Sequence, residues 1–167
     1  IIDSDETGDP TGTAWTEIGT LDKYGHNEEW KLARRINELL TEIVARVRQL
    51  LNAGWPKVRI VTDHGWLLVP GALPKEDLPH YLADTRWGRC ATLKETSETT
   101  HLTVGWHWNP NVRIAMAPDM RVHRKGLGYA HGGISVQECL VPRVTVKKTG
   151  TQQPDAQIAS VEWGRLR

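Results

Sequence analysis

Five side chains that can act as metal ligands stand in three short pieces of the sequence. The first piece places Asp22 four residues before His26. The second places Asp63 next to His64, and the third places His131 before two glycines. Carboxylate oxygens and imidazole nitrogens together suit Zn²⁺ or Mn²⁺ better than Ca²⁺, and the absence of cysteine from the set excludes a zinc finger. The set therefore predicts a site for divalent metal ions.

Each piece taken alone has a simpler interpretation. An Asp and a His four residues apart occur often by chance, and Asp63 can be a hydrogen-bonded residue at the end of a strand. His131 can be an exposed residue in a glycine turn. The three pieces support a metal site when they are taken together, because they supply two carboxylates and three imidazoles.

A strand, a helix and a second strand are predicted to position the first two pieces. Apolar side chains at helical spacing predict a helix over residues 27–53, with Asn27 as its N-cap and Gly54 as its stop signal. Loose alternation predicts a strand over residues 13–20, and β-branched residues predict another over residues 57–62. This order is typical of parallel strands joined by a right-handed crossover.

Both pieces lie next to these predicted elements. Asp22 and His26 precede the helix, in a turn from which both side chains can reach one ion. Asp63 and His64 follow the second strand, and in open α/β sheets ligands bind beyond the carboxyl ends of the strands. Neighbouring strand residues point to opposite faces, so these two can share an ion only where the strand breaks. Gly65 permits such a break.

The rest of the chain is predicted to have shorter elements. A loop rich in proline and glycine covers residues 66–90. Shorter strands follow near residues 91–94, 102–107, 112–117 and 139–146. Residues 147–157 are polar, contain Gly and Pro, and predict a linker, while residues 158–167 predict the start of a following β segment.

The composition is that of an ordinary globular protein, and it excludes few classes of function. The chain is 39% hydrophobic and 25% charged, with a net charge of +1 that gives no overall argument for nucleic acid or a membrane surface. Without a recognisable signal peptide or long apolar run, the expected compartment is cytoplasmic. Cys90 and Cys139 stand far apart and are expected to be reduced thiols.

The segment from Arg86 to Arg89 admits two interpretations. In the first interpretation, the two arginines bind a phosphate or Trp87 stacks on a base. In the second, Trp87 packs between two solvated arginines. Trp106 and Trp108 alternate as at the end of a strand, which favours core or interface positions. Four histidines outside the three pieces are expected at the surface: His80, His101, His107 and His123.

The order Asp-x-x-x-His, Thr-Asp-His-Gly and His-Gly-Gly resembles the second half of the alkaline phosphatase superfamily. That superfamily includes the cofactor-independent phosphoglycerate mutases and the nucleotide pyrophosphatases. The surrounding residues are more similar still to the PglZ proteins of the phage growth limitation and BREX defence systems. Within residues 13–146, four segments carry this resemblance: 16–26, 61–71, 85–90 and 131–142.

The resemblance implies an α/β fold, as a portion of a three-layer αβα alkaline-phosphatase-like core with a small antiparallel β extension. Residues 1–146 would be the C-terminal, metal-binding half of a PglZ domain. The chain begins at Ile1 rather than Met and ends in residues typical of a starting strand, so we expect a piece of a longer bacterial protein.

The resemblance also implies two divalent metal ions, Zn²⁺ or Mn²⁺. Asp22, His26 and His131 resemble the three ligands of one ion. Asp63 and His64 resemble two ligands of the other, which the superfamily completes with an early Asp and a Ser or Thr nucleophile. No segment of this chain matches either of those motifs. The implied partners are the missing N-terminal half of the same protein and other phage-defence subunits, with no membrane.

In the intact enzyme, the implied reaction is hydrolysis of a phosphate ester or a phosphodiester, with the ions stabilising the oxygens of in-line displacement. This chain alone is expected to be inactive, because it lacks a positioned nucleophile. The rival hypothesis is a non-catalytic binding or scaffold module of the defence complex, in which the metal site is structural.

Overall fold

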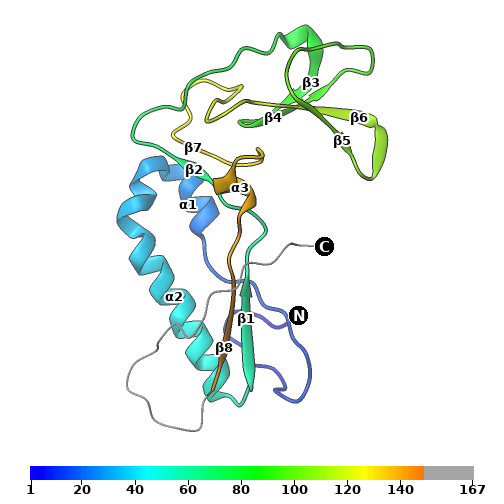
Figure 1. The fold of residues 1–167 in the computed structure, drawn as a ribbon. Coiled ribbons are helices and arrows are strands. Elements are labelled where there is room, and N and C mark those ends of the chain that lie inside the picture. Colours follow the sequence, from blue (N-terminus) through cyan, green and yellow to red (C-terminus); the bar gives the residue numbers. More distant parts are fainter. Residues whose placement is uncertain (149–167) are drawn as a thin grey trace.

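Residues 1–148 are described by a computed structural model, which shows a mixed α/β fold with one long helix and three antiparallel sheets (Figure 1). The helices are α1 (Leu21–Glu28), α2 (Leu32–Asn52) and α3 (Val136–Cys139), with 3₁₀ turns η1 (Glu29–Lys31) and η2 (His80–Leu82). The strands are β1 (Lys57–Val61), β2 (Leu67–Leu68), β3 (Ala83–Arg86), β4 (Cys90–Leu93), β5 (Thr103–Trp106), β6 (Asn109–Met116), β7 (Tyr129–Ala130) and β8 (Arg143–Lys147). None of the helices in this part of the chain is long and apolar enough to cross a membrane.

The long helix α2 is held by one buried stripe and by the N-terminal segment. Its buried residues recur at helical spacing: Leu32, Leu39, Arg46, Val47 and Leu50. The guanidinium of Arg46 donates to the carbonyl oxygens of Asp3 and Glu6 at 3.0 and 2.6 Å, which fastens the N-terminal segment to the helix. The helix ends where predicted, because Gly54 adopts a φ of 104° that suits a glycine after a helix.

The start of the long helix was predicted wrongly. α2 begins at Leu32 rather than at Asn27, and the preceding residues form the separate helix α1. The break falls at Glu29, whose φ of 50° leaves the helical path and whose carboxylate accepts the N–H of Gly128 at 3.1 Å. The residues predicted as a turn ahead of the helix are therefore themselves helical.

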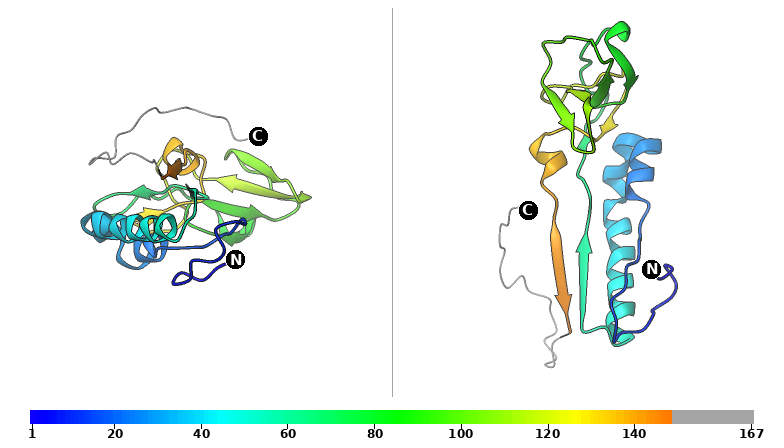
Figure 2. Two further views of the ribbon diagram at one scale, coloured as in Figure 1. Left: turned by 90° about the horizontal axis from the view of Figure 1, so that it is seen from below. Right: turned by 90° about the vertical axis from the view of Figure 1, so that its right-hand side faces the viewer.

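The predicted parallel pair of strands is also wrong. Residues 13–20 form no strand, because the large apolar side chains there, Trp15 and Ile18, are exposed and would give a strand no buried face. The second predicted strand is confirmed as β1, but its partner is β8, and the two are antiparallel. Figure 2 shows β8, β1 and α2 lying side by side, as a two-stranded ribbon beside one helix.

A four-stranded antiparallel sheet, in the order β3-β4-β6-β5, forms the upper part of Figure 1. It covers a small apolar cluster: Leu78, Ala83, Ala91, Leu93 and Ala115. The strands predicted near residues 91–94, 102–107 and 112–117 are confirmed as β4, β5 and β6. The predicted loop at 66–90 also contains β2, η2 and β3.

The smallest sheet pairs β2 with β7, and it matters most for the candidate site. Leu67 lies opposite Ala130 and Leu68 lies opposite Tyr129. Since β2 starts three residues after His64 and β7 ends just before His131, this pairing brings the two histidines close together.

The strand predicted over residues 139–146 is shorter than expected. The helix α3 extends to Cys139, and the strand begins only at Arg143. Residues 149–157 of the predicted linker and the β segment at 158–167 lie outside the described residues.

A buried ion pair joins three separate segments. The guanidinium of Arg89 donates to both carboxylate oxygens of Glu138, at 2.9 and 3.0 Å, and both side chains are 1% exposed. Arg89 also donates to the carbonyl oxygens of Asp119 and Arg121. Glu138 in turn accepts the N–H of Gly133 at 2.8 Å. The pair therefore ties the start of β4, the segment after β6 and the glycine turn before α3 into one unit.

Neither interpretation of residues 86–89 holds for Arg89, which is buried and donates four hydrogen bonds. Trp87 is exposed, and Arg86 donates to the carbonyl oxygen of Leu78 at 2.6 Å. Burial by itself would raise the pKa of Glu138, but the hydrogen bonds that it accepts, first of all from Arg89, lower the pKa below its ordinary value. The glutamate is therefore ionised at neutral pH, and the pair is a true salt bridge.

Replacing Arg89 with Met should lower the free energy of unfolding by about 3–5 kcal/mol, because the charge of Glu138 would stay buried without its partner. Denaturant unfolding followed by tryptophan fluorescence measures the change. Arg124 is exposed and makes no ion pair among the described residues, so Arg124→Met should shift the same quantity by less than about 0.5 kcal/mol. Equal effects of the two substitutions would contradict the buried pair.

Candidate metal centre

Three of the five predicted ligands converge in one cluster. Asp22 and His26 lie one turn apart on α1, where four-residue spacing puts both side chains on one face. His131 reaches them from a segment 105 residues after His26. Its Nε2 lies 2.9 Å from Nε2 of His26 and 3.3 Å from Oδ1 of Asp22. Nε2 of His26 lies 3.7 Å from the same carboxylate oxygen.

The spacing of these three atoms fits a single divalent ion. Ligand atoms at about 2.0–2.1 Å from a tetrahedral ion lie ~3.3–3.4 Å apart, and the three distances bracket that value. The two Nε2 atoms are in contact, so one of them must carry a proton unless a cation accepts both lone pairs. Among residues 1–148, this is the one group of three such side chains whose ligand atoms lie so close together.

The protonation state of His131 also suits a ligand. Burial lowers the pKa of His131, and the nearby imidazole of His64 lowers it further, while the carboxylate of Asp22 opposes these effects. The net change is downward, so the ring is neutral at pH 7. An imidazole must be neutral to bind a metal ion, and this one keeps a free lone pair for that purpose.

Asp63 and His64 lie next to this cluster, just beyond the carboxyl end of β1 as predicted, although β1 belongs to an antiparallel pair. Nε2 of His64 lies 3.7 Å from Oδ1 of Asp63. Nδ1 of His64 lies 3.0 Å from the carbonyl oxygen of Gly65, which can only accept, so Nδ1 carries a hydrogen and Nε2 is the nitrogen that could bind an ion. The rings of His64 and His131 stack with centroids 4.0 Å apart, which makes the five side chains one continuous group.

Tyr129 contacts two residues of the cluster, although no role was predicted for it. Its hydroxyl donates to Oδ1 of Asp22 at 2.8 Å, and its ring meets the ring of His26 edge-on with centroids 5.1 Å apart. Burial raises the pKa of Tyr129, with a further contribution from Asp22, so the phenol keeps its proton and remains a donor. One sequence signal was available: Tyr129 stands two residues before His131, the spacing that puts strand residues on the same face.

Three glycines permit the close contacts around the cluster. A Cβ at Gly25 would overlap the ring of Tyr129, and a Cβ at Gly65 would overlap the backbone of α3. A Cβ at Gly133 would overlap both Glu138 and Arg89. The glycine turn after His131 is therefore required by the buried ion pair as well as by the flexibility that the sequence suggested.

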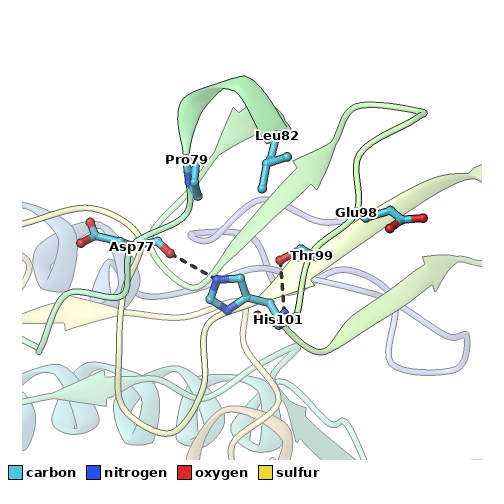
Figure 3. A pocket seen from close by; sticks show the side chains of 7 residues that line it. Asp77, Pro79, Leu82, Glu98, Thr99 and His101 are labelled. Atoms are coloured by element: carbon cyan, nitrogen blue, oxygen red, sulfur yellow. Dashed lines mark hydrogen bonds between the residues drawn. The ribbon is translucent and has the colours of Figure 1, made fainter.

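The remaining histidines are not all at the surface. His80 and His107 are exposed as predicted, but His123 is 1% exposed. The backbone N–H of His123 donates to the carbonyl oxygen of Gly88, and its Nδ1 lies 3.3 Å from the carbonyl oxygen of Glu76. His101 is partly buried beside a surface pocket that contains none of the five candidate ligands. Its Nε2 lies 3.2 Å from the carbonyl oxygen of Asp77 (Figure 3).

The two tryptophans predicted for a core or an interface lie at the tip of the β5–β6 hairpin. Trp106 is 47% exposed and Trp108 is 81% exposed, so the core interpretation is wrong within the described residues. Their rings contact each other edge-on, with centroids 6.3 Å apart. The interface interpretation stays a prediction.

Comparisons with protein-family models, with curated proteins and with solved structures find no match for this chain. The geometry of the cluster is therefore the main support for any functional assignment.

Replacing Tyr129 with Phe should weaken Zn²⁺ binding by about tenfold, because partners that orient a metal ligand typically contribute 10–100-fold to affinity. Isothermal titration calorimetry measures this change. Tyr81 is exposed and lies outside the cluster, so Tyr81→Phe serves as the matched control and should leave affinity unchanged. A Tyr129→Phe protein that melts at a lower temperature but binds Zn²⁺ as tightly as wild type would assign the tyrosine a purely structural role.

Proposed function

We propose that this chain is the metal-binding part of a divalent-metal-dependent phosphohydrolase of the PglZ type, within the alkaline phosphatase superfamily. The observation that carries the proposal is the convergence of Asp22, His26 and His131, whose ligand atoms lie within 3.7 Å of one another. The same three residues resemble one ligand set of that superfamily. Two sequence pieces more than 100 residues apart have no other evident reason to place two imidazoles and a carboxylate in contact.

The proposed fold is a portion of a three-layer αβα core. In support, β1 contacts α2, and the partly covered residues of the two strands are all apolar: Val58 and Ile60 of β1 and Val146 of β8. One helical layer on one face of a sheet would produce such a pattern. The four-stranded antiparallel sheet would be the small β extension. The proposed location is the cytoplasm, which suits the two free thiols of Cys90 and Cys139.

Each side chain has a proposed role. Asp22, His26 and His131 would hold one ion, and Asp63 and His64 would contribute two ligands to a second. The ions would be Zn²⁺ or Mn²⁺, and when bound they would act as Lewis acids toward the oxygens of a phosphate ester or phosphodiester. Tyr129 orients the carboxylate of Asp22 by hydrogen bonding, and the ring of His64 fixes the plane of His131 by stacking.

We further propose that the nucleophile and the remaining ligand come from another part of a longer bacterial phage-defence protein. Two protein ligands hold a divalent ion only loosely, since structural sites use four and catalytic sites use three. Without a positioned nucleophile, a bound phosphate ester would have no group to attack it.

The second candidate function is a binding or scaffold module of a defence complex, in which the metal is structural. One observation discriminates between the two. Structural zinc sites are closed by four protein ligands, whereas catalytic sites keep an open position. Asp22 and His26 are each half exposed, and Asp63 is 88% exposed, so the cluster faces solvent on one side. This openness favours the catalytic interpretation.

The purified chain should bind Zn²⁺ or Mn²⁺, and His131→Ala should weaken that binding by more than about 100-fold, beyond the effect typical of outer-shell residues. Calorimetry with the metal alone measures the affinity, and a rise in melting temperature on adding metal checks it. His107→Ala removes an exposed histidine outside the cluster and is the matched control. Identical metal binding by both variants would exclude this site.

The chain alone should show no turnover of an aryl phosphate or an aryl phosphodiester with Zn²⁺ or Mn²⁺, because it has no positioned nucleophile. The longer protein should hydrolyse one of these compounds, and Asp63→Ala should abolish that activity. A side-by-side spectrophotometric assay of both proteins provides the test. Metal-dependent turnover by the chain alone, lost in Asp63→Ala, would show that the nucleophile lies within this sequence.

A further inference from the structure

The pairing of β1 with β8 sorts their side chains onto two unlike faces. Residues directly opposite in an antiparallel pair share a face, and alternate residues along each strand do the same. One face carries Val58, Ile60, Val144 and Val146. The other face, here called the basic face, carries four cationic side chains: Lys57, Arg59, Arg143 and Lys147. Thr145 and Val61 complete the basic face, which contains no acidic residue.

No carboxylate within residues 1–148 neutralises the charges of the basic face. All four cationic residues are exposed, and none of them lies within ion-pair distance of a carboxylate in residues 1–148. Lys57 also lies directly opposite Lys147, an arrangement in which like charges destabilise a strand pair. The ribbon therefore holds a concentration of positive charge at a cost to its own stability, and an anionic partner would remove that cost.

We propose that the basic face binds the phosphate backbone of a nucleic-acid duplex. Same-face residues along a strand lie ~6.6 Å apart and cross-strand neighbours ~5 Å apart, so four cations occupy a patch small enough to meet adjacent phosphates. A duplex presents one negative charge per ~1.7 Å of its axis, so several phosphates lie within reach of such a patch. Two-stranded ribbons are also among the elements that the major groove admits.

The composition of the basic face argues against two other occupants. Single-stranded nucleic acid is usually bound with aromatic side chains on which bases stack, and this face carries none. A protein interface has an apolar centre with few charges, whereas this face has Val61 as its one apolar residue and lacks any aromatic anchor. Contacts made by Lys and Arg to phosphates position a duplex without reading its sequence, so the expected binding is independent of sequence.

The net charge of +1 gives no sign of this surface, because acidic residues elsewhere in the chain cancel the positive charges of the basic face in the total. The basic face is also separate from the candidate metal centre. β1 ends at Val61, two residues before Asp63, and none of the four cationic residues belongs to the metal cluster. Duplex binding is therefore expected even in the presence of EDTA, which removes divalent metal ions. A failure of the proposed phosphohydrolase function would leave this proposal unaffected, and the reverse also holds.

The test is fluorescence anisotropy of the 167-residue chain with a labelled mixed-sequence DNA duplex of about 20 bp, in EDTA, over a range of salt concentrations. The test variant carries Gln at positions 57, 59, 143 and 147. Each phosphate contact contributes about 0.9 to the slope of log affinity against log salt, so this variant should lower the slope by about 3.6 and the affinity by more than tenfold. A control variant carries Gln in place of four exposed cations elsewhere: Arg48, Lys94, Arg124 and Lys125.

The control variant has the same net charge as the test variant and should bind the duplex within about twofold of wild type, because non-contacting charges act only through screened fields. Equal weakening by both variants would overturn the proposal, as would wild-type binding that does not saturate. Tighter binding of poly-glutamate than of the duplex, lost in the test variant, would assign the face to an acidic protein segment and would also overturn it.

A double variant keeps the proposal testable if the fourfold variant fails to fold. Replacing Lys57 and Lys147 with Gln removes the opposed like charges, so the melting temperature should stay the same or rise slightly. The affinity for the duplex should nevertheless fall, with the slope lowered by about 1.8. A stable double variant with unchanged affinity and slope would show that these two lysines make no contact with the duplex and would contradict the proposal.

Discussion

The buried pair of Arg89 and Glu138 is the interaction on which the candidate metal centre most depends. Two charges without water cost several kcal/mol unless hydrogen bonds replace their hydration, and here carbonyl oxygens surround the guanidinium while N–H groups surround the carboxylate. One of those N–H groups belongs to Gly133, two residues after His131. The pair thus converts a glycine-rich turn, which would otherwise sample many conformations, into a fixed support for His131, the third candidate ligand.

The ligands reach the centre by two different routes. Asp22 and His26 are neighbours because of helix geometry alone, and any stable α1 would place them on one face. His131 arrives only when β7 pairs with β2, and that pairing depends on tertiary packing. Tyr129 connects the two routes, since it lies on β7 and donates to Asp22 on α1. Metal binding in such a centre would link the folding of the N-terminal helix to that of the second half of the chain.

The sequence predicted local features better than tertiary ones. The interior of α2, the strand β1 and the stop at Gly54 depend on periodicity and on backbone preference, and all three were predicted correctly. The break at Glu29 depends on a hydrogen bond to Gly128, and the burial of Arg89 depends on a carboxylate 49 residues away, so neither has a local signal. The parallel pairing failed for a related reason: an alternating pattern over residues 13–20 cannot show whether a neighbouring surface exists to bury it.

The exposure of the side chains around the candidate centre helps to distinguish a structural metal site from an open one. Behind the ligands, Tyr129, Arg89 and Glu138 are buried and hydrogen-bonded, so the support is rigid. The side chain of Asp63, by contrast, is 88% exposed. A site that served only to hold the fold together would gain by enclosing its ligands, since burial strengthens the bonds of an ion to its ligands. The candidate centre instead combines a rigid, buried support with a face that is open to solvent.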